Sequence, residues 1–294
     1  PYERVTPFGS PAKVSFLSPF IHSTILSLYA KYDNTMKNPL RVDEMINPHV
    51  SVDCVVLGFD GEHLKVLLVK QTGHEESGYY NNMKLPGSLI YNDEDLDEAA
   101  QRVLYELTGL NELHLIQFRA FGSKNRTNNP KDIKWLERFH QLNQKVERIV
   151  TITYLTMVKI DKKLTHLSDR YEACWTDIDA LCPLAFDHNQ IIGEALWFVR
   201  QYVQTQPAAL FDLLPKRFTA AELRTLYETI YDRKFDVRNF HKRIAQMKYV
   251  LPLEEFQTGV AHRAARYYKF DRKLYNKLHG MGKSFSPDEH NEIY

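Results

Sequence analysis

The sequence predicts an α+β protein with two domains. Between residues 48 and 205, strand-like and helix-like segments follow the order β-β-loop-helix-β-β-helix, without the regular alternation of an α/β fold. From Lys216 to Lys277 the chain holds 15 Lys and Arg against 7 Asp and Glu, whereas the remainder holds 23 against 30. We therefore expect an N-terminal extension over 1–47, a first domain over 48–205, a basic second domain over 206–280 and a tail over 281–294.

The composition indicates a soluble globular protein. Of the 294 residues, 44% are hydrophobic and 26% are charged. Cys54, Cys174 and Cys182 are widely spaced, so they form neither a disulfide framework nor a CxxC metal pair. Free cysteines of this kind indicate a reducing, cytoplasmic compartment.

The N-terminal segment differs from the rest of the chain. Residues 14–30 are fairly apolar but contain Pro19 and His22, which makes them a poor membrane-spanning segment. Met36 opens a stretch that reads like a natural start. We expect residues 1–35 to be upstream translated sequence or a weakly ordered arm; the alternative, a genuine N-terminal element, stays open.

The first domain opens with a hairpin. Residues 51–59 alternate and are rich in β-branched side chains, and residues 64–70 follow after the turn DGEH. A polar loop covers 75–85. Apolar residues then recur at helical spacing over 93–108, and Gly109 is a natural C-cap. Strands are expected at 113–121 and 148–160, a short apolar segment at 171–175 and a helix at 189–204.

The segment GSLIYNDEDLDEAAQRVLYELTGL, residues 87–110, carries a chemical motif. Gly87, Glu94, Arg102, Glu106 and Gly109 recur at spacings that resemble a Nudix box. The hairpin before the segment and the sequence FDH at 186–188 also resemble that family. The resemblance implies a Nudix-like mixed-sheet α/β/α domain whose cleft binds nucleoside diphosphate derivatives.

The motif departs from the family pattern where the acids belong. Ser88 occupies the box glycine position, and Val103 and Leu107 replace two glutamates. Nudix hydrolysis uses Mg²⁺ held by several carboxylates, and one carboxylate is a weak magnesium site. We therefore predict no metal, no cofactor and no catalysis, and an amphipathic packing helix. A Mg²⁺-dependent hydrolase of ADP-ribose or a related nucleoside diphosphate is the alternative.

A pocket can persist after its chemistry is lost. The residues expected to bind an effector there are Lys70, Lys84, Glu106 and Arg126. An inserted charged segment covers 128–147, and its Trp135, Leu136 and Phe139 could form one helical turn. The insertion is interpreted as a solvated loop, with a lid or a dimer contact as alternatives.

The second domain shows two capped helices. Thr219 and Glu222 form a capping box, and Asp236 is placed to cap the second helix. The apolar residues expected to face inward are Leu223, Leu226, Tyr227 and Ile230 on the first helix and Val237, Phe240, Ile244 and Met247 on the second. Two short helices joined by a tight turn indicate a helix-turn-helix.

Basic residues cover the opposite side of the second helix and the hairpin that follows. Two extended stretches around a basic turn over 251–270 are typical of a β-wing. Arginine can read guanine and asparagine can read adenine in the major groove. The residues predicted to bind DNA are Lys216, Arg217, Arg238, Asn239, His241, Lys242, Arg243, Lys248, His262, Arg263 and Arg266. A sensor whose basic module binds protein or RNA is a third possibility.

The order of the two domains resembles the Nudix-related transcriptional regulator family. That resemblance implies a winged helix-turn-helix domain, a homodimer on palindromic operator DNA and a small-molecule effector. The effector would be a pentose such as L-arabinose or an ADP-ribose-like metabolite. In place of the family's R-D-P this chain has Arg126, Thr127 and Asn128, which weakens the resemblance to the ADP-ribose-responsive branch, and the lost carboxylates fit non-hydrolytic members, including the sugar-responsive ones. We expect a ligand-responsive regulator, a repressor rather than an activator, of sugar or NAD-related metabolism.

Overall fold

The computed structural model describes residues 46–71, 83–130, 132–133, 148–160, 164, 171–259 and 264–279, all within one compact unit that begins at Ile46. Residues 1–45 of the expected N-terminal extension and the tail lie outside the described residues, as do Trp135, Leu136, Phe139, His262 and Arg263, whereas residues 46 and 47 belong to the first strand. In the described part of the chain, no helix has the length and apolar character needed to cross a membrane.

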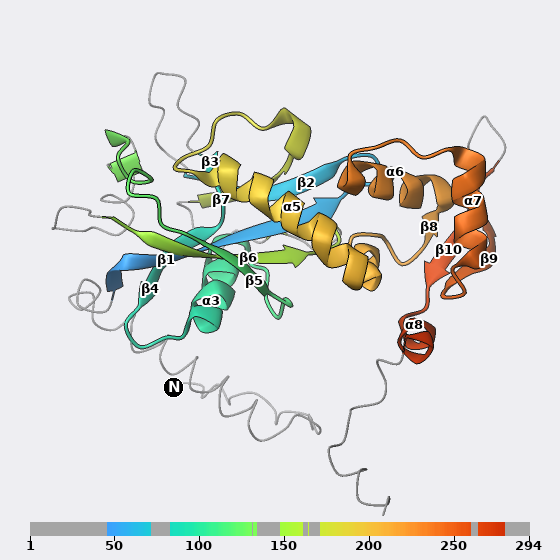
Figure 1. Ribbon diagram of the computed structural model, residues 1–294, viewed down its shortest axis with the longest axis horizontal. Coiled ribbons are helices and arrows are strands. Elements are labelled where there is room, and N and C mark those ends of the chain that lie inside the picture. Colours follow the sequence, from blue (N-terminus) through green and yellow to red (C-terminus); the bar gives the residue numbers. More distant parts are fainter. Residues whose placement is uncertain are drawn as a thin grey trace, which may run out of the picture. The chain divides into compact units, whose positions relative to one another are not determined.

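The first domain is built on a mixed sheet of seven strands (Figure 1). The strands are β1 (Ile46–Phe59), β2 (Leu64–Gln71), β3 (Met83–Lys84), β4 (Gly87–Tyr91), β5 (Ile116–Phe121), β6 (Val150–Met157) and β7 (Tyr171–Asp177). The sheet order is β3-β2-β1-β6-β5, with β4 on β1 and β7 on β2. Only β1 and β6 pair in parallel among these strands. The predicted α+β class and the β1–β2 hairpin are confirmed.

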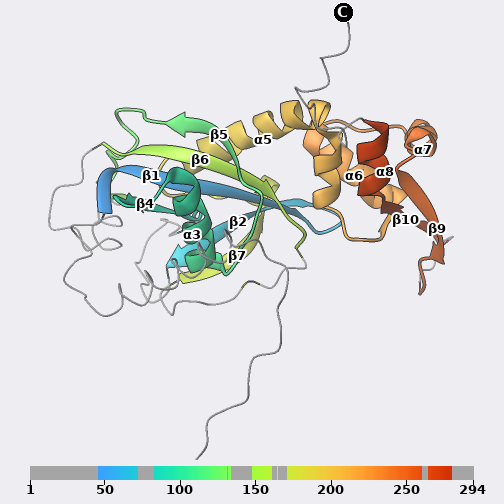
Figure 2. The ribbon, with the colours of Figure 1, turned by 90° about the horizontal axis from the view of Figure 1, so that it is seen from below.

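Strand β1 is buried on both faces, and its alternation separates two apolar layers. Val55, Leu57 and Phe59 belong to the layer under α5 (His188–Thr205). Val52, Cys54 and Val56 belong to the layer under α3 (Leu96–Thr108). Because successive side chains of a strand point to opposite faces, the two helices cover opposite faces of the sheet (Figure 2).

Helix α3 is the helix of the motif segment, and it starts three residues later than predicted. The Glu98 carboxylate accepts the Asp95 backbone N–H at 3.0 Å, which places the helix start there. Gly109 ends the helix with a φ of 73°, the left-handed conformation expected of a glycine C-cap. Val103 and Leu107 are buried in the core, so the interpretation of this helix as a packing element is confirmed.

Several elements differ from the prediction. Strand β5 begins at Ile116 rather than 113, because Glu112 turns the chain with a φ of 50° and Leu113 enters the core. Strand β6 is shorter than 148–160. The short strand β3 lies at the end of the loop expected over 75–85, and the short strand β4 follows that loop. Residues 171–177 form a full strand that pairs with β2.

The second domain has the order of a winged helix. Its elements are the 3₁₀ helix η3 (Pro207–Asp212), β8 (Phe218–Thr219), α6 (Ala220–Tyr231), α7 (Val237–Gln246), β9 (Val250–Phe256), β10 (Arg266–Phe270) and α8 (Arg272–Leu278). Strands β8, β10 and β9 form an antiparallel sheet. The Thr219–Glu222 capping box and the Asp236 cap on Asn239 are confirmed. Neither η3, β8 nor α8 was predicted.

The prediction that Val237 of α7 faces the core was wrong. Phe240 and Ile244 are buried and Met247 is partly buried, as the spacing predicts. Val237 is 48% exposed. It is the first residue of α7, so no preceding turn of the helix covers its side chain.

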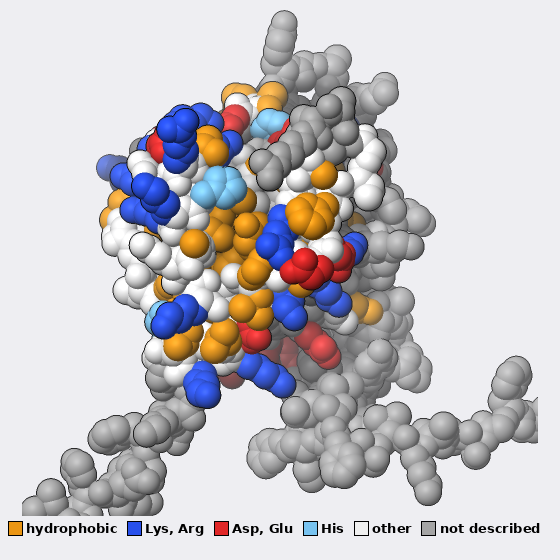
Figure 3. All heavy atoms as spheres, turned by 90° about the vertical axis from the view of Figure 1, so that its right-hand side faces the viewer, with side chains coloured by type: hydrophobic (Ala, Val, Ile, Leu, Met, Phe, Trp, Pro, Cys, Tyr) orange, Lys and Arg blue, Asp and Glu red, His pale blue; other side chains and the backbone are white. Residues whose placement is uncertain are grey.

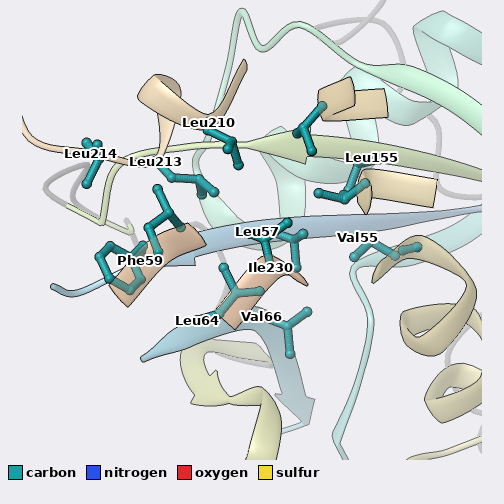
Figure 4. Close-up of a cluster of buried hydrophobic side chains, with 14 of the residues drawn as sticks. Val55, Leu57, Phe59, Leu64, Val66, Leu155, Leu210, Leu213, Leu214 and Ile230 are labelled. Carbon is teal, nitrogen blue, oxygen red and sulfur yellow. The ribbon is translucent and has the colours of Figure 1, made fainter. Parts of the chain in front are cut away.

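The two domains share one apolar core. Leu57 and Val66 of the sheet lie close to Ile230 of α6, and Leu210 and Leu213 pack over the same strands (Figure 4). Arg200 of α5 also donates a 2.8 Å hydrogen bond to the Ile230 carbonyl. The winged helix is therefore attached to the sheet by packing as well as by the chain.

Candidate effector pocket and nucleic-acid interface

A polar pocket opens where β1 and β4 meet the start of α5. Two of the residues expected to bind an effector, Lys84 and Arg126, line it together. Lys70, on β2, and Glu106, on α3, are not among its lining residues. The full lining is Ser51, Asp53, Lys84, Gly87, Ser88, Leu89, Arg126, Thr127, Ile149, Phe186 and His188.

Arg126 is held in the wall of this pocket by a network of acceptors. Its Nη2 and Nε donate to the two carboxylate oxygens of Asp187 at 2.8 and 3.0 Å. Its Nη1 donates to the Ile149 carbonyl at 3.3 Å, and Nη2 lies 3.7 Å from the Asp53 carboxylate. A bidentate pair of this kind orients the guanidinium as well as neutralising it.

Lys84 and Gly87 place a buried cation beside Asp53. The Lys84 ammonium donates to the Gly87 carbonyl at 2.5 Å. Burial lowers the pKa of Lys84 to about 8, and the Asp53 charge opposes that shift. A Cβ on Gly87 would lie 1.8 Å from the Asp53 Oδ1, so only glycine lets this carboxylate approach the strand.

His188 completes the pocket at the first residue of α5. Its Nδ1 accepts the Leu85 backbone N–H at 2.9 Å, and its Nε2 lies 3.5 Å from the Asp53 Oδ1. Phe186, two residues earlier, has a φ of 56°, a strained conformation typical of functional sites. Asp53, Asp187 and His188 were missed as site residues; the FDH sequence was the only signal for Asp187 and His188, and Asp53 had none.

The buried His188 predicts a dependence of stability on pH. Burial lowers the pKa of His188 to about 4, against the opposing charge of Asp53. Lys84, Arg126 and Asp187 also face the ring. Between pH 6.5 and 4 the unfolded chain binds a proton that the folded chain does not, so stability falls as the pH falls through this window. We expect a loss of about 2 kcal/mol between pH 7 and pH 5.

Urea unfolding at both pH values measures this loss. The variant His188→Gln keeps an acceptor for the Leu85 N–H but cannot titrate, so the difference between variant and native protein isolates the histidine. The same pH dependence in both proteins would contradict the assignment.

The charged residues of the motif segment form their own network outside the pocket. Arg102 donates to both oxygens of Glu94 at 2.8 and 2.5 Å and to Glu106 at 3.2 Å. Its guanidinium also lies 4.1 Å over the Tyr91 ring. Burial raises the pKa of Glu106, and the Arg102 charge opposes that shift. Glu106 is thus engaged as an ion-pair partner of Arg102.

The residues of α3 do not fit a magnesium site. Two positions where the motif requires carboxylates are the buried Val103 and Leu107. Among the residues that the structure describes, one group of three potential metal ligands is close together: Asp60, His63 and Asp177. Lys65 forms ion pairs with both carboxylates of that group, and none of the group's residues belongs to α3.

Helix α7 presents the predicted DNA-reading residues to solvent. Phe240 and Ile244 face the core, and the exposed side carries Arg238, Asn239, His241, Lys242 and Arg243. On the side of the molecule that includes α7 and β9, Lys and Arg side chains surround a mainly apolar centre (Figure 3). Lys216, Arg217 and Lys248 are also exposed, and Arg266 is partly exposed on β10.

Comparison with known proteins supports both halves of this description. Residues 47–196 match the model of the NUDIX domain, and residues 210–270 match that of the NrtR DNA-binding winged helix domain. The chain belongs to the NrtR-type family. The domains of this NrtR-type chain follow one another in the predicted order, so the suspected family is confirmed.

Relatives of the family share the fold at low sequence identity. The chain is 24% identical, over 78% of its length and 85% of the relative's, to the ADPR responsive transcriptional repressor NtrR of Acinetobacter baylyi. It is 22% identical to Shewanella oneidensis NrtR crystallised with a 27mer DNA, covering 75% and 93% of the two chains with a TM-score of 0.54. A MutT/nudix family protein from Enterococcus faecalis is 24% identical, covering 76% and 88%, with a TM-score of 0.50.

Proposed function

We propose that this NrtR-type protein is a repressor that binds operator DNA through its winged helix and releases it when a small molecule occupies the Nudix pocket. The observation that carries the proposal is the pairing of two surfaces in one chain. One is a polar pocket in which Lys84 and Arg126 converge, and the other is an exposed basic face on α7. We also propose a cytoplasmic location, because the proposed partner is DNA.

The chemistry of the pocket favours a ligand that carries both anionic groups and hydroxyls. Lys84 and Arg126 offer charged donors, and Asp53 offers a carboxylate that can accept from a sugar hydroxyl. ADP-ribose combines a diphosphate with ribose hydroxyls, and the Acinetobacter baylyi relative is named as ADPR responsive. We therefore favour ADP-ribose over L-arabinose and other pentoses, which lack the phosphates.

The pocket binds its ligand without hydrolysing it in this proposal. Val103 and Leu107 remove the carboxylates that a magnesium-dependent reaction requires, and Arg102 engages Glu106. The alternative is hydrolysis of ADP-ribose with Mg²⁺, which would release AMP.

Two continuous elements connect the pocket to the winged helix. On β1, Asp53 lines the pocket and Phe59 packs in the shared core, roughly 20 Å further along the strand. On α5, His188 lines the pocket and Arg200 bonds the Ile230 carbonyl of α6, about 18 Å along the helix. We propose that a ligand that shifts either element at the pocket also displaces the C-terminal end of α6. Coupling of about 1–3 kcal/mol would change DNA affinity about 5- to 150-fold.

Binding of the full-length protein to DNA upstream of its own and neighbouring genes tests the proposal. Fluorescence anisotropy at physiological salt would report DNA binding by the protein alone, by the protein with ADP-ribose and by the protein with L-arabinose. Specific binding released by ADP-ribose supports the proposal, and release by L-arabinose alone would reassign the effector. AMP formation on incubation with Mg²⁺ and ADP-ribose, with no specific DNA binding, would favour the hydrolase.

A substitution on α7 tests the DNA-reading face. Arg238→Ala is expected to weaken operator binding by about 1–3 kcal/mol and to relax specificity at one base pair. Lys273→Ala removes one positive charge from the exposed surface of α8 and serves as the matched control. Equal affinities of the Arg238→Ala variant and the native protein would remove Arg238 from the interface.

We also propose that the working form is a homodimer. A two-fold symmetric protein would place two α7 helices on the two halves of a palindromic operator. Sedimentation equilibrium of the full-length protein measures the assembly directly, and a monomer at concentrations that saturate the operator would exclude it.

A further inference from the structure

Two acidic residues on β9 hold two arginines of the DNA-binding domain. Glu255 forms an ion pair with Arg217, which precedes β8. Glu254 forms an ion pair with Arg266 at the start of β10. We call Arg217 and Arg266 the wing arginines, and their contacts with DNA the wing contacts. Both arginines are among the residues predicted to bind DNA.

Neighbouring groups reinforce the position of each arginine. The Arg266 Nε donates to the Leu253 carbonyl at 2.7 Å, and its guanidinium lies 5.9 Å from the centre of the Phe256 ring. The Arg217 guanidinium lies 5.7 Å from the centre of the Tyr267 ring. Each carboxylate already occupies a donor of its guanidinium, so a phosphate that binds either arginine competes with a carboxylate that is in place.

Exchange of the carboxylate for a DNA phosphate at either arginine is possible but unfavourable. The Glu254 side chain is 90% exposed, and pairs this open to water contribute only about 0–1 kcal/mol, so DNA can separate them. The released carboxylate then remains beside the phosphates and repels them. The wing arginines therefore contribute less to phosphate binding than arginines without an acidic partner.

The arginines of α7 differ from the wing arginines in their ion pairing. Within the described part of the chain, no ion pair engages Arg238 or Arg243. Phosphate contacts carry no sequence information, whereas base contacts in the major groove do. Weakening the wing contacts while leaving α7 available raises the share of the binding energy that depends on sequence.

We propose that Glu254 and Glu255 are specificity-determining residues, which weaken the hold of the wing on phosphate and so restrict stable binding to sequences that α7 reads. This inference rests on the proposed DNA-binding function. It adds that two carboxylates of the domain, those of Glu254 and Glu255, compete with DNA phosphates for the same arginines.

The test measures binding of the full-length protein to a mixed-sequence DNA duplex over a range of salt concentrations. The double variant Glu254→Gln with Glu255→Gln is expected to bind this duplex about two- to fivefold more tightly at low salt. The salt dependence is expected to steepen by roughly one to two units of slope, because two arginines then neutralise phosphate without a competing carboxylate beside them. Glu194→Gln removes one negative charge from the exposed Arg119–Glu194 pair, as each single substitution does from its own pair; it is the control for Glu254→Gln or Glu255→Gln alone and should have no effect.

A double-mutant cycle separates the pairing from general repulsion. Glu255→Gln should raise affinity in the native background but not in the Arg217→Ala background. An equal gain in both backgrounds, or a gain matched by Glu194→Gln, would overturn the inference. If the native protein binds duplex DNA and the double variant binds equally well, this inference fails alone. If the native protein binds no duplex at any salt concentration, the proposed function fails with it.

Discussion

Replacing Asp187 with alanine is expected to lower the free energy of unfolding by about 3–5 kcal/mol, because it leaves the Arg126 charge buried without its main partner. The Arg126 side chain is 3% exposed, and both of its bonds to the Asp187 carboxylate would be lost. The remaining Asp53 carboxylate lies 3.7 Å away, beyond hydrogen-bond distance. Urea unfolding measures the loss.

Two further variants separate stability from function at this pair. Asp179→Ala removes an exposed aspartate from the nearby 3₁₀ helix η2 (Ile178–Ala180) and should change stability by less than about 0.5 kcal/mol. The double variant Arg126→Met with Asp187→Leu should recover much of the stability, because no charge stays buried alone. It should nevertheless fail to bind ADP-ribose in calorimetric titration. A stable Asp187→Ala protein would refute the account of Arg126.

Replacing Phe240 with alanine is expected to cost about 3–5 kcal/mol, the range for removing a buried aromatic ring. Phe240 is 2% exposed and contacts Tyr227 and Phe235 at ring-centroid distances of 5.6 and 5.9 Å. These contacts fix α7 against α6, so DNA affinity should fall together with stability. Thermal unfolding and binding to duplex DNA measure the two effects.

The control for this substitution lies on the same helix. Val237→Ala removes an apolar side chain that is 48% exposed, and it should change neither stability nor DNA affinity by more than about 0.5 kcal/mol. Equal effects of the two substitutions would mean that α7 is not packed as described.

The elements that could be predicted from the sequence are those with a strong repeating pattern or a chemical end signal. Strand β1 is apolar and rich in β-branched residues because both of its faces are buried. The N-terminal ends of α3 and α6 carry capping boxes, and the αL Gly109 ends α3. Strands β3 and β8, of two residues each, are too short to show any period. They form because neighbouring strands supply their hydrogen bonds, which a local pattern does not contain.

The pocket could be predicted only in part for a similar reason. Lys84 and Arg126 were identified, but Asp53 lies within an apolar strand and gives no signal of its own. It becomes a site residue through Gly87, whose missing side chain lets the carboxylate approach. Glu106 was expected at the site by analogy, and the structure instead pairs it with Arg102. Contacts between distant segments decide both cases.

The core shared by β1, η3 and α6 has a consequence for the lifetime of the protein. A ligand that binds only the folded state stabilises the whole cooperative unit, by about 2.7 kcal/mol at a hundredfold excess over its Kd. Because the DNA-binding half belongs to that unit, an occupied pocket protects it against unfolding and proteolysis. Under the proposed function, the effector that releases the protein from DNA would also preserve it, and a cell rich in effector would keep intact repressor for the moment when the effector is consumed.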